Sequence, residues 1–286
     1  MKLTKKFELT AMLKSYGFSF SKTLGQNFLI DDNILKKIIA AADISRKSNV
    51  LEIGPGAGTL TKELCASAGK VAAVEIDNSL IPILEAALSS FDNFTLINRD
   101  IMEVDIETLT QEIFKGAPFS VIANLPYYIT TPIVMKFLES GCAVRSMTLM
   151  VQKEVAARMT AAPGSKDYGA LSVAVRLRAE PKIICTVPPH CFVPQPKVTS
   201  TVIKLSIYED PPYSVNDMDK LLKIVKSVFS QRRKTLVNSL LGSPYLKADK
   251  QQIITALNEM QLDERIRGEK LDIRQFIELS DRLSIL

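Results

Sequence analysis

A strand-like apolar run ends in Asn124, Leu125, Pro126 and Tyr127, the residues with the clearest chemistry in this sequence. The side-chain oxygen of Asn124 can accept one hydrogen of an exocyclic amine. Pro126 has no N–H and holds Leu125 extended, so the Leu125 carbonyl can accept the second hydrogen. The ring of Tyr127 offers a flat face for a base, and such stacking contributes about 1–3 kcal/mol. Together these residues predict a clamp for a flat heteroaromatic amine.

An amine of this kind is a poor nucleophile, because its lone pair is delocalised into the ring. Two acceptors on its hydrogens favour a pyramidal nitrogen, whose lone pair can point at an electrophilic methyl group. The chemistry is then positioning and electrostatics, with no strong base needed before attack. The single histidine, His190, lies in a proline-rich segment, so we do not expect histidine base catalysis at this site.

Glycines and acids follow the three preceding strand-like segments. Gly54, Gly56 and Gly58 come directly after an apolar run, where glycine lets the backbone approach a ligand and turn into a helix. Glu75 ends the next run and can accept hydrogen bonds from ribose hydroxyls. Asp100 ends the third, and its carboxylate can accept from an adenine amino group. Because ligands bind at the carboxyl edge of parallel strands, these positions predict a nucleotide-like cofactor.

These glycines and acids alone do not distinguish NAD from S-adenosylmethionine. No Gly-Lys-Ser/Thr follows the glycines, which excludes a P-loop. The dinucleotide fingerprint fits poorly, because its third glycine would fall at Thr59. The amine clamp at Asn124 favours S-adenosylmethionine, whose sulfonium supplies an electrophilic methyl group.

The elements that position these residues alternate between strand and helix. Strands are predicted at 49–53, 70–77, 93–100, 119–125, 146–152 and 199–207, and helices of this region at 59–68, 78–90 and 131–140. Alternation of this kind implies βαβ units, a parallel sheet and right-handed crossovers. The sequence therefore predicts an α/β fold with a Rossmann-like sheet and helices on both faces.

Two features of the sequence suggest where the domains begin and end. The stretch that begins with Asp31 and Asp32 has an N-cap residue and helical spacing, which places a helix within an N-terminal segment of residues 1–47. Acids and prolines cluster at 208–214, where we place a boundary. The predicted divisions are an N-terminal segment with its helix (1–47), the α/β domain (48–208) and a helical domain (214–286). In the last, helices are expected at 217–241, 247–260 and 272–286.

Bulk composition sets broad limits on function. The chain has 286 residues, of which 47% are hydrophobic and 23% charged, as in globular proteins with a substantial core. Its net charge of +5 permits a polyanionic partner without proving one. The four cysteines form no CxxC pair, so we expect no metal site and no disulfide framework. Neither a secretory signal nor a membrane span is recognisable, so we expect a cytoplasmic protein.

The motifs, taken in order, resemble those of the ribosomal RNA adenine dimethyltransferases. The resemblance spans about residues 17–280. It rests on "LGQNFLIDDNIL", "EIGPGAGTLT", "VEID", "RDI", "NLPYYITTP", "FVPQPKVTSTVI" and "FSQRRKTLVNSL". It implies a Rossmann-like class I S-adenosylmethionine-dependent methyltransferase domain, with a small all-helical RNA-recognition domain after it.

The resemblance also implies roles for individual residues. The implied contacts of S-adenosylmethionine are Asn27, Leu29, Gly54, Glu75, Asp100 and Asn124. Asn124, Leu125, Pro126 and Tyr127 would surround the target adenine, and Phe192 would be the second aromatic residue near the base. Family members transfer two methyl groups to N6 of each of two adjacent adenosines, in a hairpin loop near the 3′ end of 16S rRNA. Tyr128 stands where some members carry Asn, and we expect that difference to affect loop packing.

An adenine in structured RNA has to be splayed out before it can enter such a pocket. The unstacking costs a few kcal/mol, which contacts to the RNA backbone have to offset. The basic residues that we consider for these contacts are Lys22, Arg145, Lys153, Arg158, Lys197, Arg232, Arg233 and Lys234. The last three are predicted to lie on a helix, so their side chains would fan around its axis. For any one of them taken alone, a solvated surface role is favoured over an RNA contact.

The leading hypothesis is a monomeric 16S rRNA adenine N6-dimethyltransferase that acts on the small ribosomal subunit during its maturation. The nearest alternative is the related enzyme that dimethylates one adenine of 23S rRNA and confers macrolide resistance. Leu125 before Pro126, where that enzyme usually carries Ile or a similar residue, favours the first hypothesis. Two other classes stay open: a non-catalytic RNA-binding assembly factor of the same fold, and an NAD-dependent oxidoreductase, which the glycine spacing disfavours.

Overall fold

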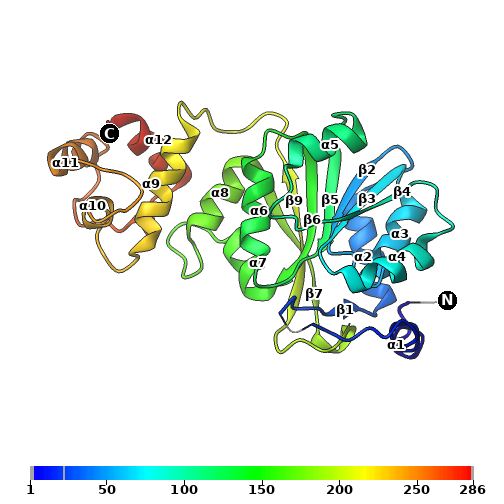
Figure 1. Ribbon diagram of the computed structural model, residues 1–286. Coiled ribbons are helices and arrows are strands. Elements are labelled where there is room, and N and C mark those ends of the chain that lie inside the picture. Colours follow the sequence, from blue (N-terminus) through cyan, green and yellow to red (C-terminus); the bar gives the residue numbers. More distant parts are fainter. Residues whose placement is uncertain (1–2, 22, 285–286) are drawn as a thin grey trace. The chain divides into compact units, whose positions relative to one another are not determined.

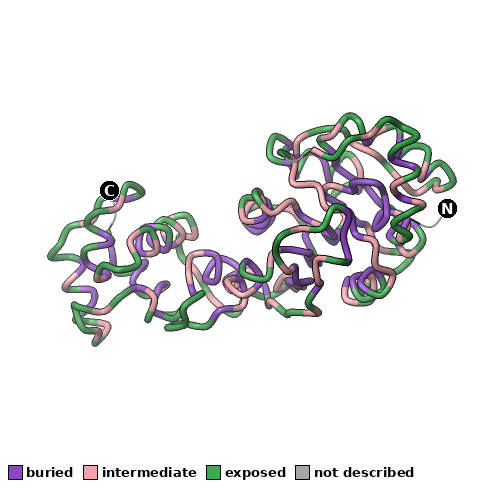
Figure 2. The backbone as a smooth tube through the Cα atoms, turned by 90° about the horizontal axis from the view of Figure 1, so that it is seen from below, coloured by how far each residue is buried: buried purple, intermediate pink, exposed green. Residues whose placement is uncertain are grey.

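The computed structural model describes residues 3–21 and 23–284, which divide into two compact units. The first unit comprises the N-terminal part up to Ala156 and the segment Glu180–Ile207. The second comprises Ala157–Ala179 and the chain from Tyr208 onward. Buried backbone runs through the interior of each unit (Figure 2). Each unit therefore has a hydrophobic core of its own.

The described residues of the first unit form a seven-stranded sheet in the order β4-β3-β2-β5-β6-β9-β7 (Figure 1). Its parallel strands are β2 (Asn49–Ile53), β3 (Lys70–Glu75), β4 (Phe94–Asn98), β5 (Phe119–Asn124) and β6 (Val144–Gln152). β9 (Ser200–Ile207) runs antiparallel to β6, and β7 (Ala179–Val187) is its other neighbour. Strand order reverses between β2 and β5, and in such sheets the ligand crevice lies at the carboxyl ends of those strands.

Helices cover both faces of this sheet, which confirms the predicted fold class (Figure 1). α2 (Asp32–Ala42) and α3 (Thr59–Ser67) pack against one face through a core that includes Ile38, Leu64 and Ile122. α6 (Thr130–Glu139) lies in front of the sheet in Figure 1, with α2 behind it. The remaining helices here are α1 (Lys6–Ser15), α4 (Ile81–Leu88) and α5 (Ile106–Phe114), with 3-10 turns at Asn78–Leu80 and Pro189–Cys191. In α7 (Lys153–Thr160), the residues up to Ala156 belong to this unit and those from Ala157 belong to the second. No helix in the described ranges is long and apolar enough to cross a membrane.

Local sequence explains where these elements begin. Asp31 caps α2, because its carboxylate accepts hydrogen bonds from the N–H groups of Asn33 and Ile34, as predicted. The central strands are buried on both faces, so β2 and β3 appear in the sequence as nearly continuous apolar runs. The two-residue strands β1 (Phe28–Leu29) and β8 (Phe192–Val193) form a separate antiparallel pair, which the sequence did not predict.

The second unit consists of helices around one apolar core. Its elements are α8 (Ala170–Arg178), α9 (Met218–Ser230), α10 (Leu236–Leu241), α11 (Lys250–Glu259), a 3-10 turn η3 (Gly268–Lys270) and α12 (Ile273–Arg282). Residues 157–179 belong here, whereas the predicted division placed them in the 48–208 domain. The physical reason is that Tyr168, Val173 and Leu177 share a core with α9 and α12.

The helix predicted over 217–241 is two helices, so that prediction is wrong in its middle. Gln231 leaves the helical region, with φ −133° and ψ 58°. Thr235 then starts α10, because its side-chain oxygen accepts a hydrogen bond from the Asn238 N–H. The basic residues 232–234 therefore lie in a turn between helices and do not fan around a helix axis.

Gly268 gives a test of the second core. A Cβ at this position would overlap Cγ1 of Val228, which is 2% exposed and cannot move out of the way. We expect Gly268→Ala to lower the free energy of unfolding by about 1–3 kcal/mol, as overpacking does. Urea unfolding followed by circular dichroism measures the change. Gly169→Ala is the control in the same unit, since no atom lies within 4 Å of its added Cβ. Equal stability of the two variants would contradict the proposed packing.

Candidate active site

One cavity lies at the carboxyl ends of β2, β3, β4 and β5, under a segment that we call the strap, residues 23–30. The predicted residues that line it are Asn27, Leu29, Gly54, Gly56, Glu75, Asp100, Asn124, Leu125, Pro126 and Tyr127. The four clamp residues thus share one cavity with Gly54, Gly56, Glu75 and Asp100, although these positions run from Gly54 to Tyr127 in the sequence. Gly58 and Phe192 were also predicted for the site, but neither lines this cavity.

Hydrogen bonds tie the strap to several strand ends. The Gln26 side chain donates from Nε2 to Oδ2 of Asp77 at 2.6 Å, just beyond β3. The Ile30 N–H donates to the Cys191 carbonyl at 2.8 Å, next to the β1–β8 pair. The backbone carbonyl of Asn27 accepts from Asn124 at the end of β5. The strap is therefore fixed across the cavity rather than hanging beside it.

The bond from Asn124 fixes the orientation of its amide. Its Nδ2 lies 2.8 Å from the Asn27 carbonyl oxygen. Because a carbonyl oxygen only accepts, the amide has to present its NH2 group to the strap. The side-chain oxygen is then left for another partner. This orientation is the one that a clamp for an amine requires.

Tyr127 is held by its hydroxyl, which lies 2.6 Å from Oγ of Ser200 at the start of β9. Burial raises the pKa of the Tyr127 phenol, and the Ser200 hydroxyl opposes that rise. The ring thus bridges the end of β5 and the start of β9 and is half-buried at the cavity wall. A ring fixed at both ends is suited to stacking, because little side-chain entropy is left to lose.

Two of the three predicted glycines line the cavity, and they serve it in different ways. Gly54 has φ +65°, and no atom lies within 4 Å of where its Cβ would be, so a ligand could approach its backbone. At Gly56 a Cβ would lie 2.8 Å from the ring of Phe28. Gly56 therefore makes room for the strap, while its N–H donates to Oε2 of Glu75 at 3.2 Å.

Glu75 is a buried carboxylate, 5% exposed, at the end of β3. Its Oε2 accepts from the Gly56 N–H and its Oε1 accepts from the Asp77 N–H at 2.9 Å. Burial raises the pKa of Glu75, and these two backbone hydrogen bonds oppose the rise. Asp100 lies beyond the next strand, where its Oδ1 accepts from the Met102 N–H at 2.8 Å. Its second oxygen can serve a ligand.

Sequence reasoning missed a second buried acid, Glu52, which lines the same cavity. Glu52 is 1% exposed, and its Oε2 has no hydrogen-bond partner among the described residues. Burial raises the pKa of Glu52 to about 8, with a further contribution from the charge of Glu75. The signal was present in the sequence, since an acid inside the apolar run "NVLEI" has to be buried with its strand.

Phe192 was expected near the target base and Tyr128 was expected to affect loop packing. Phe192 is 1% exposed and packs in the core with Leu29, its partner in the β1–β8 pair, so the structure does not present its ring to the cavity. Tyr128 is 56% exposed and lines the cavity mouth. A methyl group on Gly25 would lie 3.6 Å from the Tyr128 ring, so the ring packs against the strap.

The basic residues of the first unit fall at opposite edges of the sheet. Lys153 follows the end of β6 and Lys197 precedes β9, so both lie at the edge that carries the cavity, and both are exposed. Arg145 stands at the start of β6, seven residues or about 23 Å from that end. Arg145 therefore lies on the far edge. Lys22 is outside the described residues.

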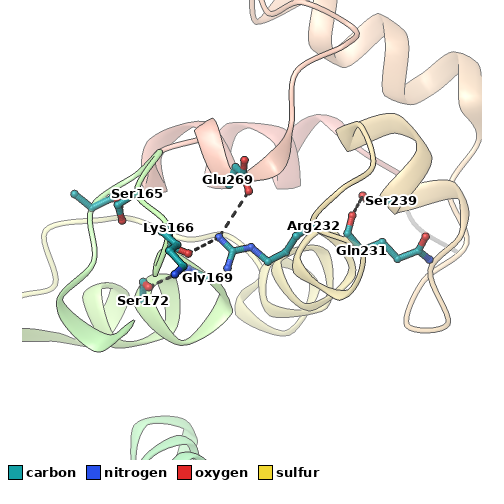
Figure 3. Close-up of polar contacts among 9 residues, drawn as sticks. Ser165, Lys166, Gly169, Ser172, Gln231, Arg232, Ser239 and Glu269 are labelled. Carbon is teal, nitrogen blue, oxygen red and sulfur yellow. Dashed lines mark hydrogen bonds and ion pairs between the residues drawn. The ribbon is translucent and has the colours of Figure 1, made fainter. Parts of the chain in front are cut away.

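The basic residues of the second unit are also unlike one another. Arg158 is half-buried, and its carbonyl accepts from Oγ of Ser172 at 2.5 Å. Arg233 and Lys234 are exposed, whereas the Arg232 side chain makes contacts within the unit (Figure 3). No group of three His, Cys, Asp or Glu residues that could hold a metal ion occurs in the described ranges.

Comparison with known sequences shows extensive similarity. A family model described as "Ribosomal RNA adenine dimethylase" matches residues 17–284. A Lachnoclostridium phytofermentans protein named ribosomal RNA small subunit methyltransferase A is 51% identical over 271 residues, 94% of this chain and 93% of that one. A protein of the same name from Bacillus licheniformis is 48% identical over 274 residues, 95% of this chain and 94% of that one.

Solved structures agree with the fold. A dimethyladenosine transferase from Plasmodium falciparum has a TM-score of 0.73 and 28% identity, covering 88% of this chain and 95% of that one. The 23S rRNA methyltransferase ErmE has a TM-score of 0.67 and 27% identity, covering 90% and 99%. The likeness extends over most of each chain.

The raised pKa of Glu52 predicts how stability depends on pH without a ligand. The folded chain keeps a proton up to about pH 8 that the unfolded chain releases near its ordinary 4.5. The free energy of unfolding should therefore fall as pH rises through this window, by up to about 1.4 kcal/mol per pH unit. Glu52→Gln should remove this part of the slope and be the more stable protein at pH 8.

Urea unfolding at several pH values measures this slope. Glu63→Gln is the matched control, because Glu63 is exposed on α3 and should leave the slope as it is. If the free energy of unfolding of Glu52→Gln fell with pH as steeply as that of the unaltered chain, Glu52 would not be the group that holds the proton.

Proposed function

The chain belongs to the ribosomal RNA adenine dimethylase family, and on that premise we propose that it dimethylates N6 of two adjacent adenosines in 16S rRNA. The target would be the hairpin loop near the 3′ end, the methyl donor S-adenosylmethionine, and the setting the assembling small subunit in the cytoplasm. The carrying observation is the single cavity that joins Asn124 and Tyr127 to Gly54 and Glu75. We propose that a single chain is the working unit.

The cavity fits the proposed cofactor in charge and shape. S-adenosylmethionine supplies an electrophilic methyl group on a cationic sulfur. The buried acids Glu52 and Glu75 give the wall negative potential once ionised, and Oε2 of Glu52 is an acceptor without a partner in the described chain. Gly54 leaves the space that a Cβ would fill, which lets a ligand approach the backbone. We assign Asp100 to the adenine and Glu75 to the ribose of such a ligand, since both residues line the cavity.

Asn124 is the group that we assign to the target amine. Its NH2 is engaged by the Asn27 carbonyl at 2.8 Å, so its oxygen accepts one hydrogen of the adenine amine. We assign the other hydrogen to the Leu125 carbonyl. The Leu125 N–H is bound to the Met150 carbonyl at 3.1 Å, which fixes this backbone, and the nitrogen that follows the carbonyl, that of Pro126, carries no hydrogen. Two acceptors hold the nitrogen with its lone pair directed along the cavity. Orientation of this kind is the main contribution that the chain makes to the rate.

Tyr127 would provide the stacking face, and lysines would hold the RNA around it. The Tyr127 ring is fixed by Ser200, so it accepts a splayed base without first being ordered. Lys153 and Lys197 stand at the same sheet edge and can contact phosphates beside the base. Arg145, at the far edge, is not supported as a contact of the same hairpin.

The small-subunit target is favoured over the large-subunit one by degree of similarity. The relatives named ribosomal RNA small subunit methyltransferase A are about half identical to this chain, at 51% and 48%. The 23S rRNA methyltransferase ErmE is 27% identical over 90% of the chain. Leu125 before Pro126, in "NLPY", supports the same choice. Macrolide resistance in cells that express the chain would instead support the 23S target.

The direct test is methyl transfer to small subunits that lack these modifications. With S-adenosylmethionine labelled in its methyl group, we expect label in 16S rRNA, in N6,N6-dimethyladenosine at two adjacent positions near the 3′ end. Mapping of modified bases by mass spectrometry reads out the sites. Large subunits from the same cells are the control substrate. Label in 23S rRNA alone, or in neither RNA, would refute the proposal.

Tyr127 allows stacking and hydrogen bonding to be separated. Tyr127→Phe keeps the ring and loses the bond to Ser200, whereas Tyr127→Ala loses both. We expect Tyr127→Ala to lower kcat/KM for small subunits by about 10- to 100-fold, the equivalent of a stacking loss of about 1–3 kcal/mol. Tyr127→Phe should stay within about fivefold of the unaltered chain. Cofactor affinity, from calorimetry, should change little in both, and an equal loss of cofactor affinity would argue against the stacking role.

A further inference from the structure

An exposed loop of the second unit is held more firmly than its position suggests. Residues 162–167 are all exposed, yet the Gly164 N–H donates to the Glu269 carbonyl at 2.7 Å. The loop closes on itself, because the N–H and the hydroxyl of Ser165 both donate to the Ala162 carbonyl, at 3.1 and 2.7 Å. Tyr168, which directly follows the loop, is fully buried, and its hydroxyl donates to the Leu271 carbonyl at 3.0 Å.

Arg232 is the side chain that completes this anchorage (Figure 3). Its guanidinium donates from Nη2 to the Lys166 carbonyl at 2.8 Å and lies 3.7 Å from Oε2 of Glu269. It thereby joins three segments that are remote in sequence: the loop, the turn after α9, and η3. Both contacts are made by Nη2, so the far end of the arginine side chain is the part that reaches the loop and η3.

The charges around the loop are arranged unevenly. Arg232 and Glu269 largely offset one another, which leaves Lys166 in the loop and Lys270 beside it. A methyl group on Gly164 would lie 3.6 Å from Nζ of Lys270, so this ammonium is close to the loop backbone. Neither lysine forms an ion pair with any residue that the structure describes. Asp167 is the one exposed acid within the loop itself.

We propose that loop 162–167 is a phosphate-binding element for RNA, with Lys166 and Lys270 as its cations, and that Arg232 is a positioning residue that holds the loop and not a phosphate ligand. The proposal rests on rRNA being the substrate. It reassigns Arg232, which the sequence suggested as a direct contact. Arg233 and Lys234, exposed in the same turn, stay assigned to phosphate.

The composition of the loop favours RNA over a protein partner. "APGSKD" has no large apolar or aromatic residue that could fill a pocket on another protein. Small residues let a phosphate approach the backbone, and unpaired lysines supply the charge. A preformed loop also binds without losing further conformational entropy, which is why its anchorage matters for affinity.

The first measurement is hydrogen exchange of the loop amides in the full chain. Arg232→Lys keeps the charge but shortens the side chain and removes Nη2 with its bond to the Lys166 carbonyl, so we expect exchange at residues 164–169 to rise by about tenfold. Arg233→Lys is the matched control, since it makes the same chemical change one residue away at an exposed position with no ion pair in the described ranges. It should leave exchange as in the unaltered chain.

The second measurement is binding to undermethylated small subunits at several salt concentrations. Arg232→Lys should raise Kd and KM by about fivefold, with kcat and the salt slope unchanged, because no charge is lost. Lys166→Ala should reduce the slope of log K against log salt by about one, the signature of one phosphate contact.

Three outcomes would overturn the inference. Arg232→Lys could match Arg233→Lys in exchange, which would remove the positioning role. It could raise exchange without altering Kd or KM, which would leave the loop a structural feature only. Lys166→Ala could leave the salt slope unchanged, which would remove the phosphate contact. Absence of methyl transfer by the unaltered chain is a separate result, and it would count against the proposed function itself.

Discussion

The site depends on one hydrogen bond, from Nδ2 of Asn124 to the backbone carbonyl of Asn27. It joins the end of β5 to the strap and decides which face of the amide is available. Turned the other way, the amide would present donors to an incoming amine, and donors repel its hydrogens. The strap is fixed in turn by Gln26 on Asp77 and by the β1–β8 pair. Contacts remote from the chemistry therefore set the polarity of the clamp.

Much of this arrangement could be predicted from the sequence, because the topology of a parallel sheet also decides where its ligand binds. Parallel strands bring their carboxyl ends to one edge, so Gly54, Glu75, Asp100 and Asn124 were expected together once the strands were recognised. The strands were recognisable since they are buried on both faces and appear as apolar runs. The helix after Asp31 was recognisable from its cap. Features with a local physical cause, such as a helix cap or a strand buried on both faces, could therefore be predicted from the sequence.

What sequence could not give were outcomes decided by tertiary contacts. Phe192 carries no local sign that it pairs with Leu29 and is buried, since a two-residue strand has no periodicity to detect. The helix through residues 232–234 failed because Thr235 caps a new helix, a choice settled by packing in the second core. Arg232 looked like a solvent-exposed cation, but Lys166 and Glu269 approach it from distant segments. In each case the deciding partner lies far away in sequence.

The two buried acids connect stability to ligand binding. Glu52 and Glu75 are removed from water in one cavity, and the charge of Glu75 helps to raise the pKa of Glu52. Without a cation nearby, the folded chain either keeps a proton there or bears the repulsion, and both states are unfavourable compared with a solvated carboxylate. A cationic ligand relieves this penalty only in the folded state, so its binding stabilises the fold by mass action. The low dielectric that makes the acids unfavourable also strengthens their attraction for that ligand. A site can thus be destabilising for the unliganded chain and, for the same reason, selective for positive charge.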